Sequence, residues 1–214
     1  RGETTVIDRI KKGGRKYDVV RNGLGEWFLH SARKFKGGKP REVLPYSPEE
    51  YEKYKARIDF DGKKKKMEDF IAEYGSQLES SEKRYGVPKE ITASVIGVES
   101  WYGKVTGKYY AFNVYVSMYV KNYRRKFALE QLEELLRFSR RRKIDVFDLK
   151  SSYAGAIGAM QFLPYSLNRW FVGEDVSDMH DTISSVANYL AYFKKRRGSM
   201  RKAVFAYNPS RLYV

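Results

Sequence analysis

The sequence predicts a mainly α-helical protein with a small irregular, β-containing segment at its N-terminal end. From residue 67 onward, apolar residues recur at intervals of three and four, which is the spacing of one helix face. Glycine and proline stand where these periodic stretches stop, as expected at helix ends. The 214 residues are 42% hydrophobic and 32% charged, which is typical of a folded globular chain. We expect a compact helical domain over residues 67–214, preceded by a basic segment over residues 1–66.

The basic N-terminal segment is predicted to contain little regular structure. Residues 1–45 hold short β-favouring runs that Gly-Gly and Asn-Gly pairs interrupt as turns. Ser47 is the predicted N-cap of a helix over residues 48–58, which has a proline at its first position. The Asp-Gly pair at 61–62 predicts a break, and the four lysines at 63–66 are interpreted as an exposed linker. Whether this segment is an accessory module or simple packing stays open.

The C-terminal domain is predicted to consist of helices joined by short connections. The periodicity indicates helices over residues 67–86, 88–102, 124–141, 183–197 and 199–208. A glycine ends the first of these helices, a proline begins the second, and a serine caps the last. The stretch between 143 and 182 contains several glycines and a proline, so no long helix is expected there.

Composition excludes several classes of function. Cysteine is absent, which excludes disulfides, thiolate metal sites and cysteine nucleophiles, and two histidines are too few for a multi-histidine metal centre. No stretch approaches the roughly 20 apolar residues of a membrane span. The net charge of +16 favours an anionic partner. Nucleic acid, an anionic membrane and a bacterial wall polymer all fit, and the sign of the charge does not choose among them.

Glu99 is the carboxylate with the clearest chemical potential. It lies near the end of the predicted helix over 88–102, where its helical neighbours are Val95 and Ile96, with Tyr102 three residues on. Partial burial there would disfavour the charged form and raise the pKa of this carboxyl group. A carboxylic acid that stays protonated near neutral pH is what glycosidic-bond cleavage needs from its general acid. The local pattern alone favours a plain surface glutamate beside a tyrosine.

Two later segments of the sequence favour a catalytic role for Glu99 over that of a plain surface residue. Residues 152–164 pack small side chains around Gln161, whose amide both donates and accepts, as sugar hydroxyls require. A tight helix crossing that merely needs glycines is the alternative. Tyr207 and Asn208 place a phenol and an amide at a predicted helix end, where an ordinary C-cap is the alternative.

These three segments, in this order, resemble the membrane-bound lytic transglycosylase B family of peptidoglycan-cleaving enzymes. The residues that carry the resemblance are Gly97-Val98-Glu99 with Gly103, Ser152 to Gly158 with Gln161-Phe162 and Pro164, and Tyr207-Asn208. The Tyr-Gly-Val-Pro at 85–88 and the segments at 124–127 and 185–189 are also similar, so the resemblance covers about residues 67–214. It implies a lysozyme-like α-helical catalytic domain with a glycan groove.

The resemblance also implies a reaction and a role for each residue. The enzyme would cleave the β-1,4 bond between N-acetylmuramic acid and N-acetylglucosamine, with the muramyl C6 hydroxyl as nucleophile and a 1,6-anhydro ring as product. Glu99 would act first as acid and then as base. Ser152 and Gln161 would surround the sugar, and Tyr207 and Asn208 would add substrate contacts. The three segments contain no second carboxylate, and a lone acid suits a nucleophile that belongs to the substrate.

The remaining expectations concern partners and location. Residues 169–181 lack the regular acidic alternation and glycine of a calcium loop, so we expect no metal and no cofactor. We expect a monomer that binds a peptidoglycan glycan strand, associates peripherally with an anionic envelope surface and binds no nucleic acid. The location implied is the cell envelope, periplasmic or extracytoplasmic, with any targeting signal upstream of Arg1. The alternatives are a hydrolytic muramidase on the same fold and a non-catalytic basic module for wall polymer or nucleic acid.

Overall fold

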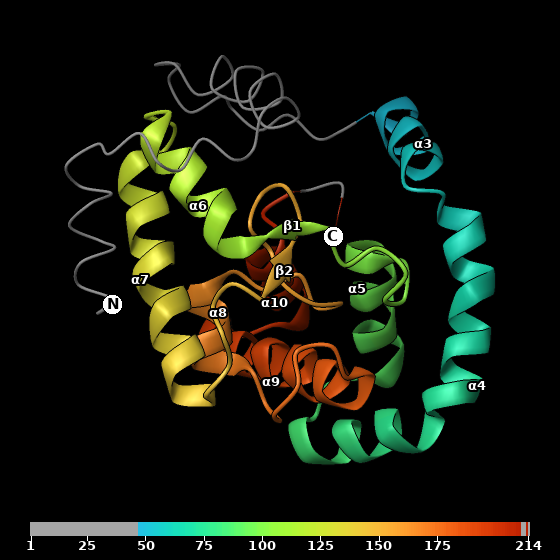
Figure 1. The fold of residues 1–214 in the computed structure, drawn as a ribbon. Coiled ribbons are helices and arrows are strands. Elements are labelled where there is room, and N and C mark those ends of the chain that lie inside the picture. The colour runs from blue at the N-terminus through green and yellow to red at the C-terminus, as the bar shows by residue number, and fades with distance from the viewer. Residues whose placement is uncertain (1–46, 211–212, 214) are drawn as a thin grey trace. The chain divides into compact units, whose positions relative to one another are not determined.

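The computed structural model describes residues 47–210 and Tyr213. This part of the chain holds eight helices and one short two-stranded sheet, which confirms the mainly α-helical class (Figure 1). The predicted β-containing segment over residues 1–45 lies outside the described residues. The described residues form two compact units. The first, named here the Glu99 unit, comprises residues 47–105, 170–210 and Tyr213, and the second, the Gln161 unit, comprises residues 106–169.

The Glu99 unit consists of five helices, three of which pack against a fourth. Its members are α3 (Pro48–Arg57), α4 (Phe60–Tyr85), α5 (Lys89–Ser100), α9 (Met179–Arg197) and α10 (Met200–Tyr207). Helix α9 packs against α4, α5 and α10, and α4 also packs along α5 (Figure 1). The apolar faces meet in a core whose fully buried members include Leu78, Ile96, Ile183, Val186 and Leu190.

Side-chain caps fix where these helices begin. Ser47 accepts a hydrogen bond from the backbone N–H of Glu50 and the Glu50 carboxylate accepts one from the N–H of Ser47, a reciprocal capping box. The Asp178 side chain caps α9 by accepting the N–H of Asp181, and the Ser199 side chain caps α10 by accepting the N–H of Lys202. The predicted helix starts at Ser47 and Ser199 are therefore confirmed, as is the end of α4 at Gly86, which is left-handed.

The predicted break at residues 61–62 and the lysine linker at 63–66 are wrong. Helix α4 already begins at Phe60 and runs through both, and the chain turns instead at Asp59, whose φ of 52° is left-handed. Lysine is a good helix former, and one glycine in a first turn costs a helix only about 1 kcal/mol. Packing of α4 on α5 outweighs that cost. Lys63 is consequently half-buried in the fold.

The Gln161 unit combines two helices with a small sheet and a compact loop. It contains β1 (Tyr109–Tyr110), α6 (Ala111–Val120), α7 (Arg125–Arg142) and β2 (Lys150–Ser151), and α8 (Pro164–Trp170) ends at its boundary. The strands are antiparallel, with Tyr109 opposite Ser151. Helices α6 and α7 pack on each other. Helix α7 confirms the helix predicted over residues 124–141.

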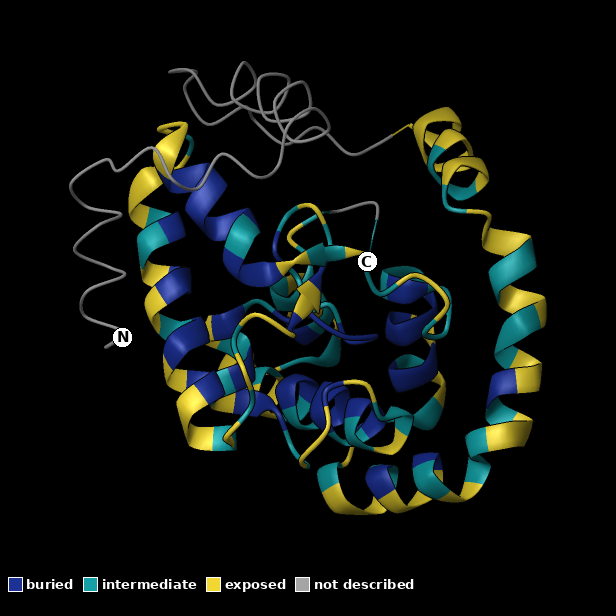
Figure 2. Cartoon of the chain, viewed as in Figure 1, coloured by how far each residue is buried: buried dark blue, intermediate teal, exposed yellow. Residues whose placement is uncertain are grey.

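Helix α6 is an element that the periodicity did not predict. Eight of its ten residues are buried, and most of this helix is dark blue in Figure 2. A helix that is apolar all round has no alternation between a polar and an apolar face, so the spacing of three and four disappears. Tyr115, at its centre, is fully buried.

The loop after β2 owes its small residues to close packing. The hydroxyl of Tyr115 donates to the carbonyl of Gly155 at 2.8 Å. A Cβ on Gly155 would lie 2.4 Å from the Tyr115 ring, and the φ of 87° at this glycine is also left-handed. At position 155, close packing against Tyr115 is therefore sufficient to explain the glycine.

None of the helices in the described part of the chain combines the length and the apolar character that a bilayer span requires.

Candidate active site

Glu99 is the penultimate residue of α5, and the turn that follows it has an unusual backbone. Trp101 and Tyr102 are both left-handed, with φ of 56° and 57°, and Gly103 follows at 83°. Bulky residues rarely adopt this conformation, which costs on the order of 1–3 kcal/mol each and persists only where the surrounding structure enforces it. Ser100, which is buried, holds the turn. Its hydroxyl accepts the N–H of Gly103 at 3.0 Å and donates to the carbonyl of Ile96 at 3.0 Å.

Tyr102 connects this turn to α4. Its ring lies directly over Gly97, where a Cβ would come within 2.5 Å of the ring, so a glycine is required there. Its hydroxyl donates to the backbone carbonyl of Lys63 at 2.9 Å. Burial raises the pKa of Tyr102 to about 12, so this hydroxyl keeps its proton across the physiological range. The end of α5 is thereby fixed relative to α4.

The Glu99 carboxyl group is half-buried and experiences opposing influences. Removal from water is the largest influence and raises its pKa. The neighbouring Tyr213 hydroxyl, the positive charge of Lys63 and the Asn208 side chain lower the pKa, in that order of importance. Burial prevails, so the pKa is raised overall, in the direction expected from the sequence. Within the described part of this unit, none of the groups that act on Glu99 in this way is a second carboxylate.

Tyr207 and Asn208 come to Glu99 from the end of α10. The Tyr207 ring packs edge-on against Tyr189, with ring centroids 4.8 Å apart. Burial, together with the charge of Glu99, raises the pKa of Tyr207 well above its usual value, so its hydroxyl stays protonated. Asn208 is the C-cap residue of α10, and its side chain acts on the Glu99 carboxyl. Three of the five residues predicted for the site therefore meet in the Glu99 unit.

Three further residues surround Glu99 and were not predicted from the sequence. Tyr213 has its hydroxyl buried beside the Glu99 carboxyl, although without a hydrogen bond of good geometry. Tyr54 lies on α3 and has its pKa raised, first by burial and in part by the charge of Glu99. Lys63 had been interpreted as part of a linker. The proximity of Tyr213 to Asn208 in the sequence was the one available signal, since the other two positions belong to helices far from Glu99 in the chain.

Ser152 and Gln161 lie in the Gln161 unit, where both are half-buried and fix the loop after β2. The Ser152 hydroxyl accepts the N–H of Ala156 at 3.2 Å. The Gln161 amide nitrogen donates to the carbonyl of Gly158 at 2.9 Å and to that of Thr106 at 3.3 Å. Gln161 is also left-handed, with φ of 50°. Each side chain therefore has a structural function in this loop.

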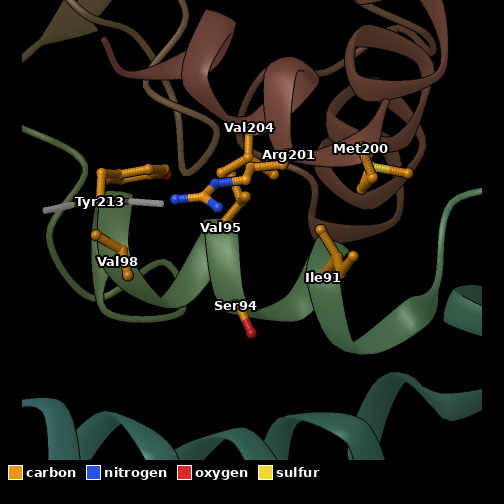
Figure 3. A pocket seen from close by; sticks show the side chains of 8 residues that line it. All are labelled: Ile91, Ser94, Val95, Val98, Met200, Arg201, Val204 and Tyr213. Carbon is orange, nitrogen blue, oxygen red and sulfur yellow. The ribbon is translucent and has the colours of Figure 1, made fainter. Parts of the chain in front are cut away.

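A pocket of about 510 Å³ lies beside the glutamate, between α5 and α10 (Figure 3). Val95 and Val98 of α5 and Val204 of α10 line it with apolar surface, whereas Ser94 points away from these side chains. The Tyr213 ring forms part of its wall, and Glu99 is not among its lining residues. A wall this apolar offers few partners to sugar hydroxyls, so we assign it no sugar.

Within the described ranges, no group of three or more histidine, aspartate or glutamate side chains is arranged to hold a metal ion.

Comparison with known protein families identifies the family to which the chain belongs. A family model described as the transglycosylase SLT domain matches residues 39–206, which is most of the chain. The chain belongs to this transglycosylase SLT domain family. Membership of this family confirms the resemblance seen in the sequence, because the family match spans the segments that contain Glu99, Ser152 and Gln161.

Individual members of the transglycosylase SLT family are similar in sequence and in fold. Membrane-bound lytic murein transglycosylase B of Escherichia coli (strain K12) is 32% identical over 129 residues, which are 58% of this chain and 36% of that protein. The soluble lytic transglycosylase SltB1 of Pseudomonas aeruginosa superposes with a TM-score of 0.66 and 27% identity, over 88% of this chain and 66% of that one.

The Escherichia coli lytic transglycosylase Slt35, solved in complex with bulgecin A, gives a TM-score of 0.67 at 25% identity. The match covers 88% of this chain and 62% of that chain. The lysozyme-like helical fold expected from the resemblance is confirmed by these superpositions. The chain spans about a third of the length of the curated relative that it matches.

Proposed function

We propose that this chain is a peptidoglycan lytic transglycosylase, which cleaves the β-1,4 bond between N-acetylmuramic acid and N-acetylglucosamine without adding water. Membership of the transglycosylase SLT family supports the proposal, as do the names of its relatives. The observation that carries it is the half-buried Glu99, whose pKa is raised by burial and whose carboxyl group is contacted by Asn208 and Tyr213. A carboxylic acid in these surroundings suits proton donation to a glycosidic oxygen.

The reaction needs two proton transfers through the same carboxyl group. In the first, Glu99 donates its proton to the bridging oxygen, and the bond from that oxygen to the anomeric carbon of the muramyl sugar breaks. In the second, the Glu99 carboxylate removes the proton of the C6 hydroxyl of that sugar, and the C6 oxygen bonds to the anomeric carbon. Glu99 ends protonated, as it began, and the 1,6-anhydro ring is formed with no water consumed.

The other residues named from the sequence are proposed as substrate contacts. Tyr207 and Asn208 lie beside the acid, where Asn208 also orients the carboxyl group. Ser152 accepts one hydrogen bond internally, and its hydroxyl hydrogen can be donated to a sugar. The amide nitrogen of Gln161 is engaged with two carbonyl groups, and its carbonyl oxygen is the atom proposed to accept from a sugar hydroxyl.

The location proposed is the cell envelope, periplasmic or extracytoplasmic, where peptidoglycan is found. The net charge of +16 supports peripheral association with an anionic envelope surface. Four consecutive cations, Lys194 to Arg197, are exposed at the end of α9 and provide one such contact. We propose that the enzyme acts as a monomer and that it binds no nucleic acid.

The product of the reaction tests the proposal directly. Digestion of purified sacculi should release anhydromuropeptides, which are lighter by one water molecule than the products of hydrolysis. Mass spectrometry separates the two outcomes. Products that all carry reducing-end muramic acid would instead identify a hydrolytic muramidase.

A single substitution tests the role of the acid. Glu99→Gln keeps the shape of the side chain and removes the proton donor, so turnover should fall by about 10²–10⁴-fold. Circular dichroism should show unchanged helix content, which excludes misfolding as the cause. A variant that keeps even a tenth of the activity would contradict Glu99 as the acid. Unaltered biological activity, with binding that weakens steeply with salt, would favour a non-catalytic basic module.

A further inference from the structure

Lys63 occupies a defined position at the end of the helix that carries Glu99. Its ammonium group donates a hydrogen bond to the backbone carbonyl of Val98 at 3.2 Å. Helix α5 ends at Ser100, so this carbonyl is among the last four of the helix and lacks an intrahelical partner. A cation at this end of a helix also interacts favourably with the helix dipole. Lys63 therefore acts as a C-terminal cap for α5 that comes from α4.

Two further contacts restrict Lys63 to this position. The hydroxyl of Tyr102 donates to the backbone carbonyl of Lys63 at 2.9 Å, so the main chain of this lysine is held as well as its side chain. The ammonium group lies 5.9 Å from the centre of the Trp101 ring, within range of a cation–π interaction. Lys63 is half-buried, which lowers its pKa, whereas the charges of Glu99 and Asp59 raise it.

Among the described groups that act on the Glu99 carboxyl, Lys63 is the one that carries a positive charge. The others are Tyr213 and Asn208, which follow α10 and are neutral. Tyr54 of α3 and Tyr207 of α10 also feel the charge of Glu99, and burial raises the pKa of each, so both are neutral too. Helix α9 contributes Tyr189, which acts on Tyr207.

We propose that Lys63 is a positioning residue that caps α5 and holds its ammonium group where it stabilises the Glu99 carboxylate formed between the two proton transfers. This inference rests on the proposed function, because only a two-step reaction needs both forms of the acid. Burial favours the protonated form required for the first step, and Lys63 favours the carboxylate required for the second. Burial and Lys63 thus act in opposite directions on the same carboxyl group.

The sign of the effect follows from the charge. The positive charge of Lys63 lowers the pKa of Glu99, so removing it should raise that pKa. The protonated fraction of Glu99 would then persist to higher pH. In Lys63→Met the alkaline limb of the pH profile of kcat/KM should therefore shift to higher pH, and kcat at neutral pH should fall because the carboxylate is less stable.

Two matched variants separate charge from structure. Lys63→Arg keeps a cation with a long side chain and should restore the wild-type pH profile. Lys64→Met removes the same charge from the next residue of α4, where the side chain is exposed, and its profile should coincide with that of the wild type. If Lys63 only held α5 in place, Lys63→Met would lower the rate without moving the alkaline limb.

A second measurement makes the result independent of turnover. The side-chain carboxyl carbons of the full chain can be labelled with ¹³C and titrated by NMR, with Glu99 identified by the signal that Glu99→Gln removes. The Glu99 titration should move to higher pH in Lys63→Met and stay in place in Lys64→Met. An unchanged Glu99 titration in a folded Lys63→Met would overturn the inference. Absence of anhydro products from the wild type would overturn the proposed function while leaving this titration interpretable.

Discussion

The surroundings of Glu99 act on the pKa of its carboxyl group in two opposite directions. Burial disfavours its charged form, and Lys63, Asn208 and Tyr213 favour it. An acid that must later serve as a base needs both forms within reach, since proton transfer is most efficient when the pKa lies near the operating pH. The position of this one carboxyl group therefore has a thermodynamic cost as well as a chemical use.

That cost is measurable as a dependence of stability on pH. Because the pKa of Glu99 is raised in the folded state, the folded protein binds its proton more tightly than the unfolded chain does. Stability contributed by this group is complete below the pKa of an unfolded glutamate, about 4.3, and is lost as the pH rises through the folded pKa. We expect Glu99→Gln to have a higher Tm than the wild type near neutral pH.

Thermal unfolding followed by circular dichroism at a series of pH values checks this expectation. The advantage of Glu99→Gln should shrink toward the acid end of the series, where the wild-type carboxyl is protonated in both states. A variant that is less stable than the wild type at neutral pH would show that the contacts of the carboxylate outweigh its burial.

At the scale of elements, close contact between α5 and the turn after it determines where Glu99 lies. The left-handed backbone at Trp101 and Tyr102 folds the chain back, so that the Tyr102 ring packs against Gly97 of α5. Tyr102 and Lys63 then join this helix end to α4 through two hydrogen bonds. The glutamate is positioned by this joint between two helices.

The contact between Tyr102 and Gly97 predicts that one added methyl group at position 97 destabilises the protein. Gly97→Ala would place a Cβ 2.5 Å from the Tyr102 ring, so the ring must move, and overpacking of this kind costs about 1–3 kcal/mol. Urea unfolding should show this loss in the free energy of unfolding. Turnover should fall too, because displacement of Tyr102 releases the end of α5.

Gly75 in α4 supplies the matched control. Apart from its chain neighbours and the backbone of α4 itself, no atom lies within 4 Å of a Cβ built at Gly75, so Gly75→Ala meets open space. Gly75 directly follows Tyr74, where α4 is kinked, but its own φ is not left-handed. Alanine is therefore tolerated at this position, and the variant should be as stable as the wild type or more so. Equal losses for the two variants would contradict a specific role for the Gly97 contact.

At the scale of the whole molecule, the excess of positive charge is the dominant property. The net charge of +16 is carried by 42 basic and 26 acidic residues. A chain of this charge attracts polyanions at long range, and the attraction weakens as salt screens it. Under the proposed function, this charge would govern how the chain accumulates on an anionic surface, and Glu99 would carry out the chemistry.

Binding to sacculi should therefore depend on salt. The inactive Glu99→Gln full chain allows binding to be measured without digestion, and sedimentation with purified sacculi should show affinity falling as ionic strength rises from about 0.05 M to 0.5 M. Chitin, an uncharged glycan, provides the control, and its binding should change little. Equal salt dependence for the two polymers would contradict attraction to the anionic groups of the wall.

The local sequence predicted much of the fold and part of the site. Ser47 and Ser199 cap helices as expected, because a side-chain cap needs only residues three positions apart. Helix α6 was missed because a helix buried on all sides carries no periodic signal. The sequence predicts a break at Asp61-Gly62 and a helix start at residue 67, whereas α4 begins at Phe60, because one unfavourable glycine yields to the packing of the helix.

The sequence by itself determined that the protein is helical, that it resembles a family of lytic transglycosylases and that Glu99 is its candidate acid. Only the tertiary structure decided what surrounds that acid. Lys63 reaches the carbonyl next to Glu99 from a position 35 residues from Val98 in the chain, and Tyr213 arrives beyond the last helix. Periodicity reports which face of each helix is buried, but the partner across the interface depends on how separate helices pack, and no local pattern encodes it.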